Sequence, residues 1–218
     1  MMAAQAVPYE GGIPMSSPKY MMVTVAKCAP QQYGKAIGHM DGLAKDLRVG
    51  AGAVTTRHGI LATGEHTGQL VLFQTYTELN GIDRAFGVYE KSAAYKGLVQ
   101  DIGVSVTLRN ILKIEDLGLK NPSSEVPAYG VVTRAVSSGL ELDRMGAMVP
   151  HFENHGAMIF RYCTILTGPA AGHRLLVVGY PSMQSIEKTY DALRGSAEYD
   201  AVLETHQIEW RNIIRVTG

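Results

Sequence analysis

Two arginines occupy equivalent places in this sequence, and arginine is a side chain suited to holding anions. Arg57 and Arg161 are 104 residues apart (161 − 57), and the residues that follow them, His58 and Tyr162, could take part in proton transfer. The planar guanidinium donates paired hydrogen bonds to a carboxylate or to an enolate-like oxygen. Because side chains alternate along a strand, either the arginine or its neighbour faces a pocket. An ion pair between strands or copies explains the arginines equally well.

Two tyrosines recur in the same way. Tyr76 and Tyr180 each stand at the end of an apolar, strand-like segment. A phenol can orient a substrate or transfer a proton, although a half-buried tyrosine with its hydroxyl at the rim of a core is the commoner role. The candidate catalytic residues are therefore Arg57, His58, Tyr76, Arg161, Tyr162 and Tyr180.

A pair of histidines suggests a different chemistry. His151 and His155 are four residues apart in a segment with helical character, a spacing that can place both imidazoles on one face as ligands of a metal or a haem. The alternative is a polar helix end, where histidine interacts favourably with the helix dipole. The corresponding segment near the N-terminus contains only His39, so a metal site would exist once. We expect no bound cofactor, with haem or a divalent metal as the alternative.

Several other functions are excluded by what the sequence lacks. It contains no glycine-rich phosphate loop, no dinucleotide-binding fingerprint, no nucleophile elbow and no zinc-protease motif. Its 20 basic and 20 acidic residues balance, which argues against nucleic acid and membrane surfaces as partners. Cys28 and Cys163 are too few for a disulfide framework and are expected to be reduced thiols of a cytoplasmic protein. No segment has the roughly 18 apolar residues of a membrane span.

The chain is an internal duplication. Residues 52–99 align without a gap with residues 156–203, and the alignment pairs Thr63-Gly64 with Thr167-Gly168. It also pairs Ser92-Ala93-x-Tyr95 with Ser196-Ala197-x-Tyr199. With small shifts of register, residues 20–26 match 129–135, and residues 109–114 match 211–216, so that Asn110 corresponds to Asn212. Repeats of this kind determine the fold more than any local pattern does.

One copy contains six elements in a simple order. Strands are expected at 21–27, 53–61, 69–77 and 104–114, and helices at 31–48 and 79–91, with a turn or short helix at 92–98. The order β-α-β-β-α-β is that of a ferredoxin-like unit, an antiparallel sheet with both helices on one face. The bare face of one sheet needs a cover, and the second copy provides it. We expect an α+β fold in which two tandem ferredoxin-like units pack sheet to sheet as an intramolecular barrel.

These boundaries divide the chain into four parts. Residues 1–19, rich in proline and glycine, are expected to form a flexible arm, and residues 20–116 the first unit. Residues 117–127, with Asn-Pro-Ser-Ser and a further proline, form the linker, and residues 128–218 the second unit.

The repeated element order resembles the dimeric α+β barrel superfamily, which includes antibiotic-biosynthesis monooxygenases, NIPSNAP-like and stress-responsive barrel proteins and, in elaborated form, chlorite dismutases. The resemblance covers both copies and implies a fused version of the usual homodimer with small pockets in each unit. It also implies, as one hypothesis, a cofactor-independent monooxygenase or isomerase acting on a small apolar or aromatic molecule. The alternatives are a non-catalytic ligand-binding or stress-associated protein and a haem- or metal-binding barrel. The fused chain could further pair into a homodimer.

Overall fold

A computed structural model describes residues 17–218. Residues 1–16, most of the predicted arm, lie outside the described residues. The first unit contains β1 (Tyr20–Lys27), η1 (Pro30–Gln32), α1 (Tyr33–Ala51), β2 (Thr55–Leu61), β3 (Leu70–Tyr76), α2 (Leu79–Lys91), α3 (Ala93–Lys96), η2 (Gly97–Asp101) and β4 (Ser105–Ile114). The second contains β5 (Tyr129–Ser137), α4 (Leu142–Asn154), β6 (Ile159–Ile165), β7 (Arg174–Tyr180), α5 (Met183–Leu193), α6 (Ala197–Leu203) and β8 (His206–Val216).

The expected element order is therefore present twice. Residues 115–128, between β4 and β5, contain no helix or strand. Local signals place the ends of the elements: α1 stops at Gly52, which adopts a left-handed conformation (φ 70°) and donates its backbone N–H to the carbonyl of Leu47. The recurrent Ser-Ala-x-Tyr segment is a helix cap, because the hydroxyl oxygens of Ser92 and Ser196 accept hydrogen bonds from the backbone N–H of Tyr95 and Tyr199.

The eight strands form one closed barrel in the order β1-β3-β2-β8-β5-β7-β6-β4. Each unit contributes four adjacent strands, and the two units meet at a β2–β8 seam and a β4–β6 seam. All neighbouring strands are antiparallel, so equivalent strands of the two units, four places apart around the barrel, run in the same direction. The pseudo-two-fold axis therefore runs along the barrel, and equivalent residues lie at the same end of it.

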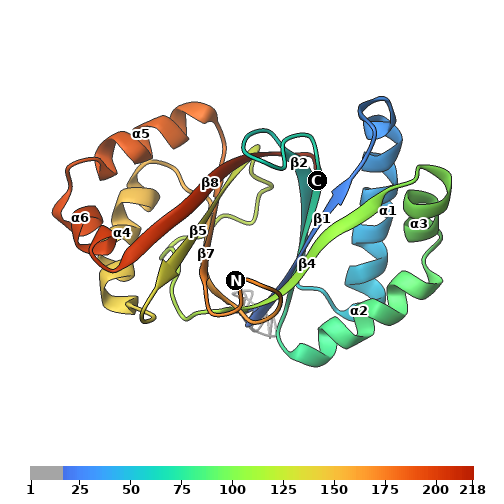
Figure 1. The fold of residues 1–218 in the computed structure, drawn as a ribbon, viewed down its shortest axis with the longest axis horizontal. Coiled ribbons are helices and arrows are strands. Elements are labelled where there is room, and N and C mark those ends of the chain that lie inside the picture. The colour runs from blue at the N-terminus through green and yellow to red at the C-terminus, as the bar shows by residue number, and fades with distance from the viewer. Residues whose placement is uncertain (1–16) are drawn as a thin grey trace, which may run out of the picture.

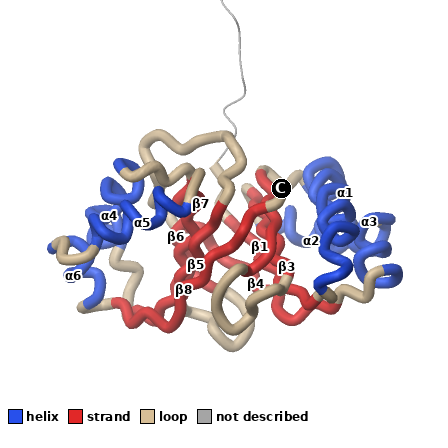
Figure 2. The backbone as a smooth tube through the Cα atoms, turned by 90° about the horizontal axis from the view of Figure 1, so that it is seen from above, coloured by secondary structure: helices blue, strands red, loops and turns tan. Residues whose placement is uncertain are grey.

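Helices cover the outside of the barrel on two opposite sides (Figures 1 and 2). Each unit has one apolar core between its sheet and its helices. This core surrounds Met22 and Leu72 in the first unit and Phe160 and Val178 in the second. A third core lies inside the barrel and draws on both units. Apolar cores therefore lie on both faces of each four-stranded sheet, and the predicted mutual cover of the two sheets is confirmed. Within residues 17–218, no helix is long and apolar enough to cross a membrane.

The recurrent Thr-Gly turns close the two seams. The Thr63 hydroxyl accepts the backbone N–H of Ile213 at 2.8 Å across the β2–β8 seam. In the same way the Thr167 hydroxyl accepts the N–H of Ile111 at 2.9 Å across the β4–β6 seam. Each hairpin turn of one unit is therefore attached to the last strand of the other.

The glycines of these turns approach the recurrent asparagines. A Cβ added at Gly64 would collide with Oδ1 of Asn212, and one added at Gly168 would lie 2.6 Å from the side-chain amide of Asn110. Both glycines also have φ of 86°, a conformation that other residues rarely adopt. The recurrence of these glycines and asparagines is explained by the geometry of the seams.

Candidate functional site

A cavity of about 660 Å³ opens at one end of the barrel. We call this the arginine end, because Arg57 on β2 and Arg161 on β6 line it from opposite walls. The rest of the lining comes from the barrel strands, from α1 and from the linker, and most of it is apolar. Its apolar members include Met21, Phe73, Ile159, Val177, Ile214, Val216 and, from the linker, Val126.

Strand alternation directs both arginines into the barrel. Leu61 on β2 and Cys163 and Ile165 on β6 belong to the core inside the barrel, and each arginine lies an even number of positions from them. The pseudo-two-fold axis then brings both guanidiniums to the same end. The sequence left open whether each arginine or its neighbour faces a pocket. In the first unit both Arg57 and His58 line this cavity, and in the second Arg161 lines it but Tyr162 does not.

Neither guanidinium has an acidic partner among residues 17–218. Nη1 of Arg57 donates to the carbonyl of Thr56 at 2.9 Å, and Nη1 of Arg161 donates to the carbonyl of Phe160 at 3.1 Å, which in each case belongs to the preceding residue. No carboxylate of the described chain lies within 4.0 Å of either guanidinium. Nε of Arg57 is buried and without a hydrogen-bond partner in this part of the chain. Unpaired donors at a desolvated charge are costly to maintain.

The electrostatics of the cavity favour an anion. Burial, and then the charge of Arg48, lower the pKa of Arg57. Burial also lowers the pKa of Arg161, against a smaller opposite effect of Cys163. Arginine starts from a pKa above about 12, so both side chains are still protonated at neutral pH. An anion between them would relieve the cost of two desolvated positive charges.

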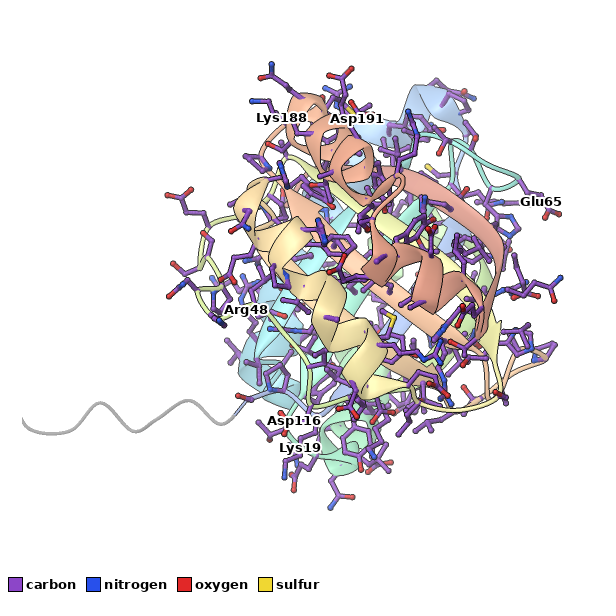
Figure 3. The ribbon with its side chains drawn as sticks, turned by 90° about the vertical axis from the view of Figure 1, so that its left-hand side faces the viewer. Lys19, Arg48, Glu65, Asp116, Lys188 and Asp191 are labelled. Atoms are coloured by element: carbon purple, nitrogen blue, oxygen red, sulfur yellow. The ribbon has the colours of Figure 1, made fainter. Side chains whose placement is uncertain are left out.

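Helix α1 adds two charged groups that no sequence motif singles out. Asp41 and Arg48 come from this helix and line the same cavity as His58. Nε2 of His58 lies 3.0 Å from Oδ1 of Asp41, and Nδ1 of His58 lies 2.9 Å from Oγ1 of Thr217. Arg48 donates to the hydroxyl of Thr56. Figure 3 shows Arg48 and Glu65 on opposite sides of the molecule, as expected for residues near the two ends of the barrel.

His58 points away from the barrel interior and toward α1. Its side chain is almost fully buried, whereas that of Asp41 is 61% exposed. Burial lowers the pKa of His58, although the charge and hydrogen bond of Asp41 oppose the shift. A neutral His58 then donates from Nε2 to the Asp41 carboxylate and accepts from the Thr217 hydroxyl at Nδ1. The Asp41–His58 pair is thus placed between solvent and the barrel wall.

Tyr162, at the position equivalent to His58, lies elsewhere. Its hydroxyl donates to the carbonyl of Leu140 at 3.0 Å and lies 2.8 Å from Nε2 of His206. This side chain lines a cavity of only about 40 Å³ between the second sheet and its helices. Burial raises the pKa of Tyr162 to about 12. The structure therefore does not bring Tyr162 together with the arginines.

Tyr76 and Tyr180 also lie apart from the arginines. Both are buried in the cores between sheet and helices, and neither lines the cavity at the arginine end. The Tyr76 hydroxyl donates to Oε1 of Gln74 at 2.7 Å. Burial raises the pKa of both tyrosines well above the usual range of a phenol. Their positions fit packing rather than chemistry at this cavity.

His151 and His155 lie at the C-terminal end of α4. Nδ1 of His155 lies 2.7 Å from the carbonyl oxygen of His151, and Nε2 of His151 lies 3.4 Å from Oε2 of Glu198. Within residues 17–218 there is no group of three or more histidine, cysteine or acidic side chains that could hold a metal ion. The metal site therefore stays a prediction, and the described residues offer no third ligand beside these two histidines.

The fold and its cavity define an α+β barrel made from two fused ferredoxin-like units. The chain belongs to the family described as Domain of unknown function (DUF6854), whose model matches twice, at residues 18–114 and 127–216. The two matches correspond closely to the two structural units. The search of curated proteins gave no match.

Solved structures share the fold at very low sequence identity. A suggested monooxygenase from Lactobacillus acidophilus NCFM has a TM-score of 0.59 and 9% identity, with 92% of this chain and 94% of that chain covered. A mutant chlorite dismutase from Candidatus Nitrospira defluvii has a TM-score of 0.60 and 8% identity, covering 94% and 93%. A heme-binding protein from Thermus thermophilus has a TM-score of 0.59 and 10% identity, covering 92% of each chain. These likenesses establish a common fold.

Four histidines, His58, His151, His155 and His206, do not fit a haem site in this arrangement. His206 lines the cavity of about 40 Å³, which has no room for a macrocycle, and its two nitrogens contact Tyr162 and Thr205. His58 lines the larger cavity, but its Nδ1 is hydrogen-bonded to the Thr217 hydroxyl and its Nε2 to the Asp41 carboxylate. Neither His151 nor His155 lines either of these cavities. A haem bound at any of these four histidines would therefore require these contacts to change.

Proposed function

We propose that this protein binds a small molecule with an apolar or aromatic body and one anionic group, a carboxylate or an enolate-like oxygen, at the arginine end of the barrel. The observation that carries the proposal is the pair Arg57 and Arg161, two partly buried guanidiniums without a carboxylate partner in the described chain. Each donates only to the carbonyl of the preceding residue, so several N–H groups of each are left for a ligand.

The size and lining of the cavity support this proposal. A volume of about 660 Å³ lies within the range of roughly 300 to 1,000 Å³ that is usual for small-molecule sites. The wall inside the barrel is formed by Met21, Phe73 and Val177, which suit an apolar body. The acidic groups of the described lining are Asp41 and the terminal carboxylate of Gly218, against Arg48 and the two barrel arginines, so the charge balance still favours an anion.

The binding proposal is tested by titrating the full-length protein with benzoate, using calorimetry, and with neutral benzamide as the uncharged comparison. We expect Arg57→Gln and Arg161→Gln each to weaken benzoate binding by about 10-fold or more, since a hydrogen bond to a charged group contributes about 1.5–3 kcal/mol. Arg194→Gln is the matched control, because its side chain is 81% exposed and lies at the C-terminal end of α5. Equal binding of benzoate by wild type and both barrel variants would contradict the proposal.

The Asp41–His58 pair favours a catalytic version of the same proposal. An exposed carboxylate hydrogen-bonded to a buried neutral histidine can accept a proton from a carbon acid, and the arginines would stabilise the enolate that forms. An isomerase returns that proton to another carbon. A cofactor-independent monooxygenase instead lets the carbanion react with O₂, its co-reactant.

Proton abstraction is measured with phenylpyruvate, an enolisable aromatic acid, in D₂O. We expect wild-type protein to accelerate exchange of the hydrogens beside the keto group, as followed by NMR. Asp41→Asn should abolish the acceleration while phenylpyruvate still binds. If wild type gives no acceleration above buffer although it binds phenylpyruvate, the protein is a binding protein and the catalytic version fails.

A further inference from the structure

A second cavity occupies the opposite end of the barrel, which we call the asparagine end because Asn110 and Asn212 line it. Its volume is about 160 Å³, and it is lined mainly by aliphatic and aromatic side chains from both units. An apolar protein cavity of roughly 150 Å³ stays dry and takes up benzene or xenon. The apolar lining consists of Val23, Val25, Leu61, Val71, Phe73, Leu108, Leu112, Val132, Ile165, Leu175, Trp210 and Ile214.

Two side chains divide this cavity from the one at the arginine end. Phe73 and Ile214 line both cavities, and among the described residues no other is shared between the two linings. They stand on β3 of the first unit and β8 of the second, so both units contribute to the partition. The barrel therefore contains two compartments with different electrostatics.

The walls of the second compartment differ between the two units. In the second unit Arg134 on β5 faces its register partner Trp210 on β8, with the guanidinium carbon 5.3 Å from the centre of the indole. In the first unit the corresponding register pair is Val25 and Leu108. One wall is therefore aliphatic, and the other presents a large aromatic ring.

The charge of Arg134 is already balanced. Its Nε lies 2.6 Å from Oε2 of Glu209, and the same carboxylate oxygen lies 2.9 Å from Nδ1 of His173. An anionic ligand would have to compete with this carboxylate, in contrast to the situation at Arg57 and Arg161. The compartment thus favours a neutral ligand, for which Trp210 provides an aromatic contact and the two asparagines provide amide groups.

We propose that the asparagine end of the barrel is a second binding site, for a neutral molecule of about one aromatic ring. It is reached from the surface beside the exposed hairpin-turn residue Glu65, which lines it together with His66. The site is independent of anion binding at the arginine end, because Phe73 and Ile214 separate the two compartments.

Trp210 is the single tryptophan of the chain, so its indole N–H gives one NMR signal that reports on this compartment alone. Titration of the ¹⁵N-labelled full-length protein with benzene, and with phenol, should shift that signal saturably. Val132→Phe and Leu108→Phe fill the compartment from a buried and a half-buried position and should weaken binding by about 10-fold or more. Leu108→Phe provides the measurement if the buried substitution prevents folding. Arg161→Gln is the matched control and should leave the titration unchanged.

Two outcomes would overturn the proposal. A Trp210 signal that does not shift saturably in folded wild-type protein would show that the compartment does not take a ligand. Loss of the benzene titration in Arg161→Gln would show one continuous site instead of two. Failure of benzoate to bind at the arginine end would affect only the proposed function, since benzene and phenol at neutral pH carry no charge.

Discussion

Each end of the barrel carries a pair of polar residues that recurs in the two copies. One pair is packed into the structure, and the other faces a cavity. At the asparagine end, Asn110 and Asn212 are packed against the glycine turns that close the seams. At the arginine end, Arg57 and Arg161 face a cavity with no acidic partner among residues 17–218. Recurrence marks both pairs equally, and the difference lies in their surroundings: the asparagines pack against the turn glycines, whereas each arginine donates only to the carbonyl of the preceding residue.

The largest expected effect tests the asparagine end. Gly64→Ala should destabilise the protein by about 3 kcal/mol, because it combines an unfavourable positive φ with a collision against the buried Asn212. Gly172→Ala is the matched control: its φ of 90° is similar, but no atom lies within 4 Å of the added Cβ. It should lose only about 1–2 kcal/mol, the cost of the backbone conformation. Equal losses in urea denaturation would show that the seam contact contributes nothing.

Variants at the two ends of the barrel should change the free energy of unfolding by smaller amounts, and they compare the two ends directly. Thr63→Val and Thr167→Val each remove one hydrogen bond across a seam and should each lower the free energy of unfolding by about 1 kcal/mol. Arg161→Met removes a desolvated charge without an acidic partner in the described chain and should leave stability unchanged or raise it. If Arg161→Met instead lost as much as the threonine variants, the arginine would be a structural residue and the contrast between the ends would disappear.

The smallest expected effect concerns pH and the two buried histidines. Burial lowers the pKa of His206, against opposing effects of a backbone hydrogen bond with Val202 and of the charge of Glu141. As the pH falls below about 6.5 the unfolded chain binds a proton at this residue before the folded chain does, so stability is lost on acidification. The same sign applies to His58.

His206→Gln should therefore flatten the decrease in unfolding free energy below about pH 6.5, as measured by urea denaturation at several pH values. Glutamine can still bond to the Tyr162 hydroxyl, so the neutral network is preserved. A decrease as steep as that of wild type would mean that His206 does not contribute to it.

The repeat made most of the fold predictable. The helix expected at 79–91 is α2, Leu79–Lys91, and the strand expected at 69–77 is β3, Leu70–Tyr76. Turn glycines and the cap at Ser92 are local signals that a sequence carries explicitly. The closed barrel followed from the bare faces of two sheets that share one chain.

The direction of individual side chains was not predictable. A strand with one solvent-exposed face alternates polar and apolar residues. Here the helices cover one face of each strand and the other face lines the barrel interior, so both faces are apolar. On β3, for example, Leu72 faces the helices and Phe73 the barrel, and nothing in their types tells which is which. The sequence therefore could not show that Tyr76 shares the face of Leu72 and not that of Phe73.

The helix and linker residues of the cavity were missed for a different reason. Asp41 and Arg48 reach the arginine end because α1 lies beside the start of β2, a contact set by tertiary packing. Ser123 and Pro127 were assigned to a linker, which predicts irregular backbone but not where it runs. These four residues carry no motif that could have selected them.

The pseudo-two-fold axis along the barrel also determines how mutations can change the lining of the barrel interior. In a barrel assembled from two identical chains, every substitution appears on both walls at once. Here a single mutation alters one wall only, which is how Arg134 and Trp210 can face Val25 and Leu108 across the same space. Fusion of the two units therefore allows the two walls of the barrel interior to differ. Such an interior can bind ligands whose two faces differ in chemistry.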